Sequence, residues 1–255
     1  MAENESASWY LHPLAARLKR EAYLTWFHRW LPMAPNGLLL KTDLFEEAYG
    51  DDTLLPDLLA SSHPIAAFDW LPPVALRARR KIPSPAFLPL AADCRALPLA
   101  SSSSSIVLSL STLDHSSDPA DLRTSIAELA RVLRPGGLLL LTLDNPMNPL
   151  YWPLRLLSRM GRTPFPLGYT PTPAVLDRLL EQAGFEILGR EWLIHNPRLI
   201  STALFLTIQR TLGRRGDPVI QALISLFNLL GRLPTRPLTA CFVATCARKR
   251  PAPRA

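Results

Sequence analysis

Residues 118–144 read DPADLRTSIAELARVLRPGGLLLLTLD, a helical pattern that ends in a Pro-Gly-Gly turn and continues as an apolar run. Asp118 followed by Pro119 is a typical helix start. The aspartate carboxylate accepts hydrogen bonds from the free N–H groups of the first turn. Proline is favoured at the first helical position because it has no N–H, and an N–H there would have no partner within the helix. The basic residues of 131–134 and the turn after them mark the other end of the helix. The following run GLLLLTL, 137–143, is apolar without alternation, as in a strand covered on both faces of its sheet. The stretch therefore predicts a helix followed by a buried central strand.

The same alternation extends outward from this stretch in both directions. Short apolar runs predict seven strands, at 37–41, 64–68, 86–91, 105–111, 137–143, 185–194 and 238–249. Helical patterns lie between them, at 45–60, 72–80, 119–133 and 173–183. Strands that alternate with helices at this spacing predict βαβ units and a mainly parallel sheet. The fold class is therefore α/β, with helices on both faces of the sheet.

Two further segments flank this pattern. Apolar residues at helical spacing predict an amphipathic helix from Pro13 to Trp30, and two strongly apolar helical stretches, 199–212 and 218–231, precede the last strand. We therefore divide the chain into an N-terminal helical extension, a core, an apolar helical insert or cap, a last core strand and a basic tail, at 1–36, 37–195, 196–236, 237–249 and 250–255.

Composition limits the classes of function. The net charge is +7 and 24 of the 28 basic residues are arginine, but they are dispersed and form no basic stripe interleaved with aromatics, which argues against a nucleic-acid partner. The three cysteines lack metal-ligand spacing, so we expect no metal site. The polar start MAENESASWY does not resemble a secretory signal, and no apolar run is long enough to span a bilayer, so we expect a cytoplasmic protein.

A family resemblance rests on residues 91–144. Glu128-Leu-Ala-Arg-Val-Leu-Arg-Pro-Gly-Gly137, with Asp93 and Leu97-Pro98 upstream, is similar to the pattern of class I S-adenosylmethionine-dependent methyltransferases of the ubiquinone/menaquinone methylase type. The resemblance extends more loosely over 37–195 and the last strand. It implies a Rossmann-like three-layer sandwich with seven strands, the last antiparallel, and S-adenosylmethionine as cofactor. It also implies methyl transfer to a small-molecule acceptor, which we expect to be apolar or lipid-like because of the apolar insert.

The resemblance also implies roles for strand-end residues. Asp69 matches the family position that accepts from ribose hydroxyls, and Asp93, with Cys94 beside it, matches the position near the adenine amine. The remaining cofactor candidates are Thr42 and Asp43 in the first loop, and Ser109, Ser111 and Leu113 at the end of the fourth strand. Carboxylates suit this ligand because they accept from hydroxyl and amine groups and tolerate a cationic sulfonium.

Acid–base residues are less well defined by the sequence. His115 follows the fourth strand and is the candidate base for an acceptor that must lose a proton, with Asp114 as the residue that orients it. His195, after the sixth strand, is a second candidate. The proline-rich segment 144–173 is interpreted as a loop or lid on the acceptor side.

The first loop departs from the family pattern. Residues 37–50 read GLLLKTDLFEEAYG and carry no glycine where such loops usually approach the ligand. Asp43 and Glu46 instead predict a capping box at a helix start. An alternative function is therefore a catalytically degenerate binding or regulatory protein of the same fold. Either kind of protein could also be membrane-peripheral, docking through 199–231 and the basic tail.

Overall fold

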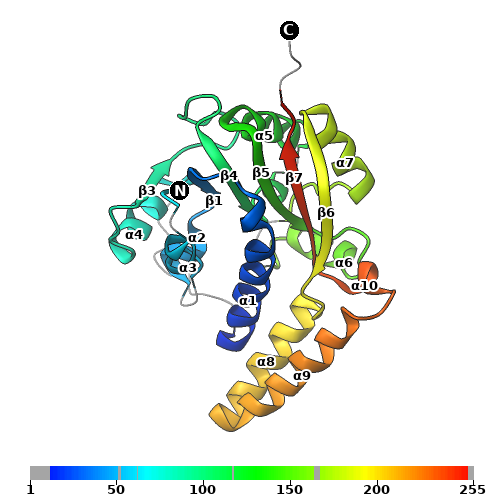
Figure 1. Ribbon diagram of the computed structural model, residues 1–255. Helices are drawn as coiled ribbons and strands as arrows, with labels where there is room; N and C mark the ends of the chain where they lie inside the picture. The colour runs from blue at the N-terminus through cyan, green and yellow to red at the C-terminus, as the bar shows by residue number, and fades with distance from the viewer. Residues whose placement is uncertain (1–11, 51–52, 62, 117, 164–166, 252–255) are drawn as a thin grey trace.

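The computed structural model describes residues 12–50, 53–61, 63–116, 118–163 and 167–251 (Figure 1). Its centre is one seven-stranded sheet of order β3-β2-β1-β4-β5-β7-β6. β7 runs antiparallel to both of its neighbours, β5 and β6, and the other pairs are parallel. The strands are β1 Leu38–Thr42, β2 Ile65–Asp69, β3 Phe87–Ala91, β4 Ser104–Leu110, β5 Leu133–Asp144, β6 Phe185–Leu193 and β7 Phe242–Lys249. The expected Rossmann-like sheet with an antiparallel last strand is confirmed.

Helices cover both faces of the sheet, and a separate apolar core fills each interface. One core joins the sheet to α1 Pro13–Trp30, α2 Phe45–Tyr49, α3 Leu55–Ala60 and α4 Pro72–Lys81. The other joins it to α5 Pro119–Val132 and α7 Pro173–Gln182. Neighbouring strand residues divide between the two cores, so that Leu39 belongs to the first and Leu40 to the second. This division explains why the strands are apolar at successive positions.

The helix and strand that the stretch 118–144 predicts are both present. The Asp118 carboxylate accepts from Ala120 N–H at 2.8 Å, which caps α5 as expected. β5 begins at Leu133, directly after α5, and therefore includes the Pro-Gly-Gly turn. Gly136 has φ of 76°, a left-handed conformation that favours glycine, and a Cβ on Gly137 would lie 2.9 Å from the carbonyl oxygen of Arg134. The two glycines thus allow the tight connection between helix and strand.

Two helical predictions need correction. The expected helix 45–60 is two short helices, α2 and α3, because Gly50 adopts an extended conformation with ψ of 154° and ends the first. The segment interpreted as an acceptor-side loop contains a helix, α6 Tyr151–Arg159. Pro153 lies in the first turn of α6, where its missing N–H breaks no helical hydrogen bond.

The apolar insert is a helical hairpin that projects from the body of the molecule (Figure 1). It consists of α8 Arg198–Leu212, a short 3-10 turn η3 Gly213–Gly216 and α9 Asp217–Leu230. A four-residue helix, α10 Arg236–Thr239, then leads into β7, which starts at Phe242, later than the sequence predicted. None of the helices in the described ranges is long and apolar enough to span a bilayer. Most of the predicted basic tail and the first residues of the N-terminal extension lie outside the described residues.

Candidate functional site

The main pocket lies at the carboxyl edge of the parallel strands and has a volume of about 680 Å³. Ligands in open α/β sheets bind at this edge, near the point where the strand order reverses, which here lies between β1 and β4. The predicted site residues that line the pocket are Asp43, Asp69, Asp93, Cys94, Ser111, Leu113 and His115. Thr42, Ser109 and Asp114 do not line it.

Thr42 and Ser109 are fully buried within the sheet. The Thr42 hydroxyl donates to the Ser109 hydroxyl at 3.1 Å, and its oxygen lies 2.7 Å from the hydroxyl oxygen of Thr112, which does line the pocket. The two residues therefore join the ends of β1 and β4 below the pocket floor. We place them as supports of the first loop instead of the ligand contacts that the sequence predicted.

The first loop turns at Asp43, which has φ of 66°. This left-handed conformation is one that glycine adopts without strain and that aspartate tolerates better than most residues. The Asp43 carboxylate accepts from Phe45 N–H at 2.6 Å, whereas Glu46 forms an ion pair with Lys19 of α1. The predicted capping box is therefore wrong. The Asp43 carboxylate accepts from the N–H of the residue two positions later, whereas a capping box requires the N–H three positions later. The Glu46 carboxylate accepts from Lys19, which is distant in the sequence.

A buried ion pair supports this loop from below. Lys41 Nζ lies 3.4 Å from Glu47 Oε1 and donates to the carbonyl oxygen of Asp43 at 2.6 Å. The Glu47 carboxylate also accepts from Leu54 N–H and Leu55 N–H, at 3.3 Å each. Lys41 and Glu47 are 4% and 0% exposed. The pair thus links β1, the loop, α2 and the start of α3 in one network.

Asp69 ends β2 and faces the pocket with 7% of its surface exposed. One carboxylate oxygen accepts from Leu71 N–H at 2.9 Å and the other from Leu44 N–H at 3.2 Å. Burial raises the pKa of Asp69 above its ordinary value of 3.8, and the bond from Leu71 N–H opposes this shift. Because a carboxylate has about four acceptor positions, each oxygen of Asp69 can still accept a hydrogen bond from a ligand.

Asp93 also lines the pocket, but its carboxylate is engaged by Arg95. The Arg95 backbone N–H and Nε donate to Oδ1 at 2.8 and 3.0 Å, and Nε and Nη2 lie 3.1 and 2.6 Å from Oδ2. These bonds hold the pKa of Asp93 below its ordinary value. The neighbouring Cys94 is a neutral thiol, since burial raises its pKa to about 12. A ligand amine would therefore compete with Arg95 for Asp93.

The segment after β4 contributes backbone turns and one histidine. Ser111 lines the pocket with φ of 49°, and its N–H donates to the Thr142 hydroxyl at 3.0 Å. His115 lies at the end of the 3-10 turn η2 Leu113–His115 and is exposed. Asp114 is buried, and its Oδ2 accepts from Asp144 N–H at 2.7 Å while Oδ1 has no partner in the described residues. The structure thus shows no hydrogen bond from the His115 ring to the Asp114 carboxylate, and the predicted orienting role is not observed.

The charge of the pocket is opposite to the charge of the chain. Its lining contains the carboxylates of Asp43, Glu46, Asp69, Asp93, Asp121 and Asp144, but only two groups that are permanently cationic, Lys19 and Arg95. Asp144 was not predicted as a site residue, although it ends β5 as Asp69 ends β2. The apolar part of the wall comes from Phe45, Phe68, Trp70, Leu71, Val74, Leu110 and Leu113. The pocket therefore suits a ligand with positive charge and apolar surface.

Comparisons with known proteins agree with the fold. Residues 48–141 match the family model described as a methyltransferase domain. No curated protein matches the chain. Several solved structures share its fold at low sequence identity.

An S-adenosylmethionine-dependent methyltransferase from Mesorhizobium loti has a TM-score of 0.59 and 16% identity over 89% of this chain and 98% of its own. A phosphoethanolamine N-methyltransferase from Haemonchus contortus has the same TM-score and identity, over 91% of this chain and 53% of its own. The [4+2]-cyclase SpnF has a TM-score of 0.60 and 17% identity over 98% of this chain and 86% of its own. Because proteins of this fold include a cyclase, the fold does not by itself define the reaction.

Proposed function

We propose that this chain, whose residues 48–141 match a methyltransferase domain and whose fold is shared by S-adenosylmethionine-dependent methyltransferases, is an enzyme of that class I family that methylates a small, apolar or lipid-like acceptor. The observation that carries the proposal is the acidic, partly apolar pocket at the carboxyl edge of the sheet. Its volume of about 680 Å³ is within the usual range for small-molecule sites.

The residues present fit S-adenosylmethionine, the cofactor of this family. Asp69 keeps free acceptor positions on both carboxylate oxygens, as ribose hydroxyls require. We assign Asp93 and Cys94 to the adenine, since both line the pocket, and Asp43 is the carboxylate of the first loop. The bound cofactor supplies an electrophilic methyl group on a cationic sulfonium. The excess of carboxylates in the pocket favours that positive charge.

The same charges constrain the acceptor. A phosphate or carboxylate on the acceptor would meet the carboxylates of the pocket, so we propose an uncharged or cationic acceptor whose apolar part contacts the wall. Methyl transfer depends mainly on holding the two reactants in line. Where the acceptor must lose a proton, His115 is the candidate base, because it lines the pocket and is exposed to it and to solvent.

Two observations favour the alternative of a non-catalytic binding protein. The Asp93 carboxylate is already occupied by Arg95, and the first loop carries an aspartate side chain where related loops carry glycine. In this alternative the pocket no longer binds the cofactor, and the protein binds or regulates a partner. Cofactor binding distinguishes the two functions.

Isothermal calorimetry with S-adenosylmethionine and S-adenosylhomocysteine tests the proposal. We expect both to bind, and Asp69→Ala to weaken binding by about 1–3 kcal/mol, the scale for a buried polar partner left unsatisfied. Asp118→Ala is the matched control, since it removes the carboxylate that caps α5 outside the pocket and should leave binding unchanged. Folded protein that gives no heat at millimolar ligand would overturn the enzyme proposal.

A further inference from the structure

The hairpin of α8, η3 and α9 has only one covered side. Its buried apolar side chains are Phe205, Ile220 and Ile224, and they pack with Leu14, Ala15 and Leu18 of α1. Figure 1 shows the two helices running together away from the sheet, with η3 at the far end. The other side of the hairpin has no neighbour within the described residues. The residue types on that side therefore indicate which kind of surface it would bind.

The uncovered side of α9 carries no charge and is largely apolar, with Gln221, Ser225 and Asn228 as exposed polar residues. From Pro218 to Leu230 the sequence has no ionisable residue, and Leu226 and Leu229 are 58% and 49% exposed. Val219, about two and three turns before them on the same side, is also exposed. Ile200 and Leu204 extend the exposed apolar surface onto α8. A surface helix in contact with water normally has a polar outer face, so this face is expected to be covered by something apolar.

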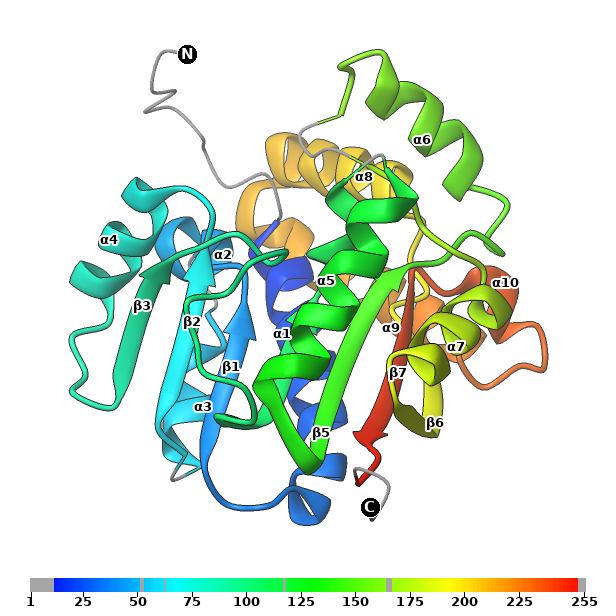
Figure 2. The same cartoon turned by 90° about the horizontal axis from the view of Figure 1, so that it is seen from above.

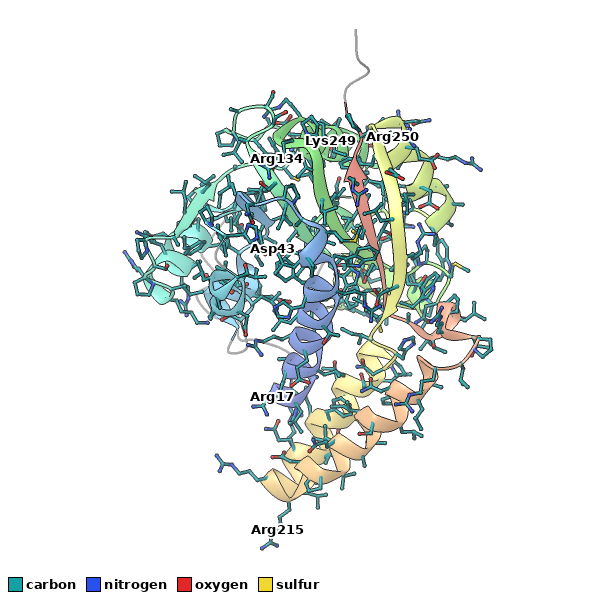
Figure 3. The ribbon with its side chains drawn as sticks, in the orientation of Figure 1. Arg17, Asp43, Arg134, Arg215, Lys249 and Arg250 are labelled. Atoms are coloured by element: carbon teal, nitrogen blue, oxygen red, sulfur yellow. The ribbon has the colours of Figure 1, made fainter. Side chains whose placement is uncertain are left out.

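The basic groups that border this face are arginines. Arg210, Arg214, Arg215 and Arg232 are exposed, and none of them has a carboxylate partner in the part of the chain that the structure describes. Arg215 points away from the protein at the tip of the hairpin (Figure 3). Asp217 is the single acidic residue between Trp192 and the end of the sequence. The surface that covers the apolar face must therefore be negatively charged as well.

A second amphipathic helix lies beside the base of the hairpin. Trp152, Leu156 and Met160 follow one another at four-residue spacing along α6, and each is more than half exposed. The buried side of α6 meets the start of α8, where Tyr151 and Leu154 line a small cavity together with Pro197. Tryptophan beside arginine is typical of elements that lie at the boundary between lipid headgroups and acyl chains.

Both elements project from the end of the molecule where the pocket opens. In Figure 2 the arrowheads of β1, β2, β3 and β5 point toward the side that carries α6 and α8. α1 connects the two regions directly, since Leu18 packs on the hairpin and Lys19 lines the pocket. A surface bound to the hairpin would therefore lie near the entrance of the pocket.

We propose that the hairpin and α6 together form a docking surface for anionic phospholipid bilayers. The exposed leucines, Trp152 and Leu156 enter the boundary between headgroups and acyl chains, and the hairpin arginines bind the lipid phosphates. The protein lies on the membrane and does not cross it. The residues of this docking surface do not line the pocket, so its test and the calorimetric test above can fail separately.

Vesicle co-sedimentation of the full chain tests the docking surface. We expect binding to phosphatidylcholine vesicles that contain phosphatidylglycerol, little binding to phosphatidylcholine alone, and release as salt is raised. Leu226→Asp/Leu229→Asp and Arg214→Glu/Arg215→Glu should each weaken partitioning by roughly tenfold or more. The second pair lies in the exposed turn η3 and removes no packing, so it remains informative if the first pair perturbs folding.

The matched controls make the same chemical changes elsewhere on the surface. Leu76→Asp/Leu88→Asp alters two equally exposed leucines on α4 and β3, at the opposite edge of the sheet, and Arg80→Glu/Arg123→Glu reverses two exposed arginines. Both controls should bind vesicles like the unmodified chain. The proposal is overturned by equal binding to neutral vesicles, by controls that lose as much binding as the hairpin variants, or by a lipid-free dimer that the hairpin variants dissociate.

Discussion

Replacing Lys41 by methionine should destabilise the protein more than the loss of any surface charge. Lys41 and Glu47 are both buried, and methionine keeps the length of the side chain while it removes the ammonium group. Glu47 would then be a buried carboxylate whose partners among the described residues are the N–H groups of Leu54 and Leu55. Removing one member of a buried ion pair costs about 3–5 kcal/mol, and for a chain of this size we expect a fall in melting temperature of about 6–20 °C.

The double variant Lys41→Met/Glu47→Gln separates the ion pair from packing. It removes the unpaired charge, and glutamine still accepts one of the two N–H bonds, so we expect it to be more stable than Lys41→Met by about 1–2 kcal/mol. Arg29→Met is the control, because Arg29 is largely exposed in its pair with Glu191 and should cost at most about 1 kcal/mol. Urea denaturation measures these three variants and the single variant Glu47→Gln. A Lys41→Met protein as stable as the control, or additive single costs in the double variant, would refute the reasoning.

Three other predictions concern the pocket and the base of the hairpin. Arg95→Ala should raise affinity for S-adenosylhomocysteine by up to about fivefold in calorimetry, because it frees the Asp93 carboxylate from an exposed ion pair; weaker binding would show that Arg95 itself contacts the ligand. Once an acceptor is known, His115→Ala should lower kcat by about 10²–10⁴-fold if the acceptor must lose a proton, and an unchanged kcat would exclude His115 as the base. Burial lowers the pKa of His195 below its ordinary value of 6.5. As the pH falls below 6.5, His195 therefore binds a proton in the unfolded chain before it does so in the folded chain. The folded protein loses stability in this pH range. His195→Gln should therefore reduce the fall in melting temperature between about pH 7.5 and 5.5, and a pH profile identical to that of the unmodified chain would contradict the assignment.

The sequence predicted those parts of the fold whose signals are local. The start of α5 at Asp118 and Pro119 and the turn that contains Gly136 depend on residues within a few positions of one another. Their structure follows from hydrogen bonds and φ preferences that a short stretch contains. The sequence also predicted that Asp69 and Asp93 lie in one pocket, because each follows a parallel strand and the carboxyl ends of parallel strands share an edge of the sheet.

Contacts between distant segments could not be predicted in the same way. Glu46 fits a capping box by spacing, but Lys19, 27 positions earlier, binds it in the folded chain. The burial of Asp114 and its bond to Asp144 N–H depend on β4 and β5 lying side by side. His195 follows a strand, as a site residue would, yet it packs at the base of the hairpin with Nδ1 2.8 Å from the Thr239 hydroxyl. In each case tertiary packing decides between partners that the sequence leaves equivalent.

The position of α1 has a thermodynamic consequence. This single helix of 18 residues packs on the hairpin through Leu14 and Leu18, and its Lys19 bonds to Glu46 on the pocket rim. If a displacement of α1 alters both contacts, occupancy at the hairpin and occupancy in the pocket are coupled, and the coupling free energy must be the same in both directions. The factor by which a bound bilayer changes cofactor affinity would then equal the factor by which the cofactor changes affinity for the bilayer. α1 is thus the helix that would couple binding at the hairpin to binding in the pocket.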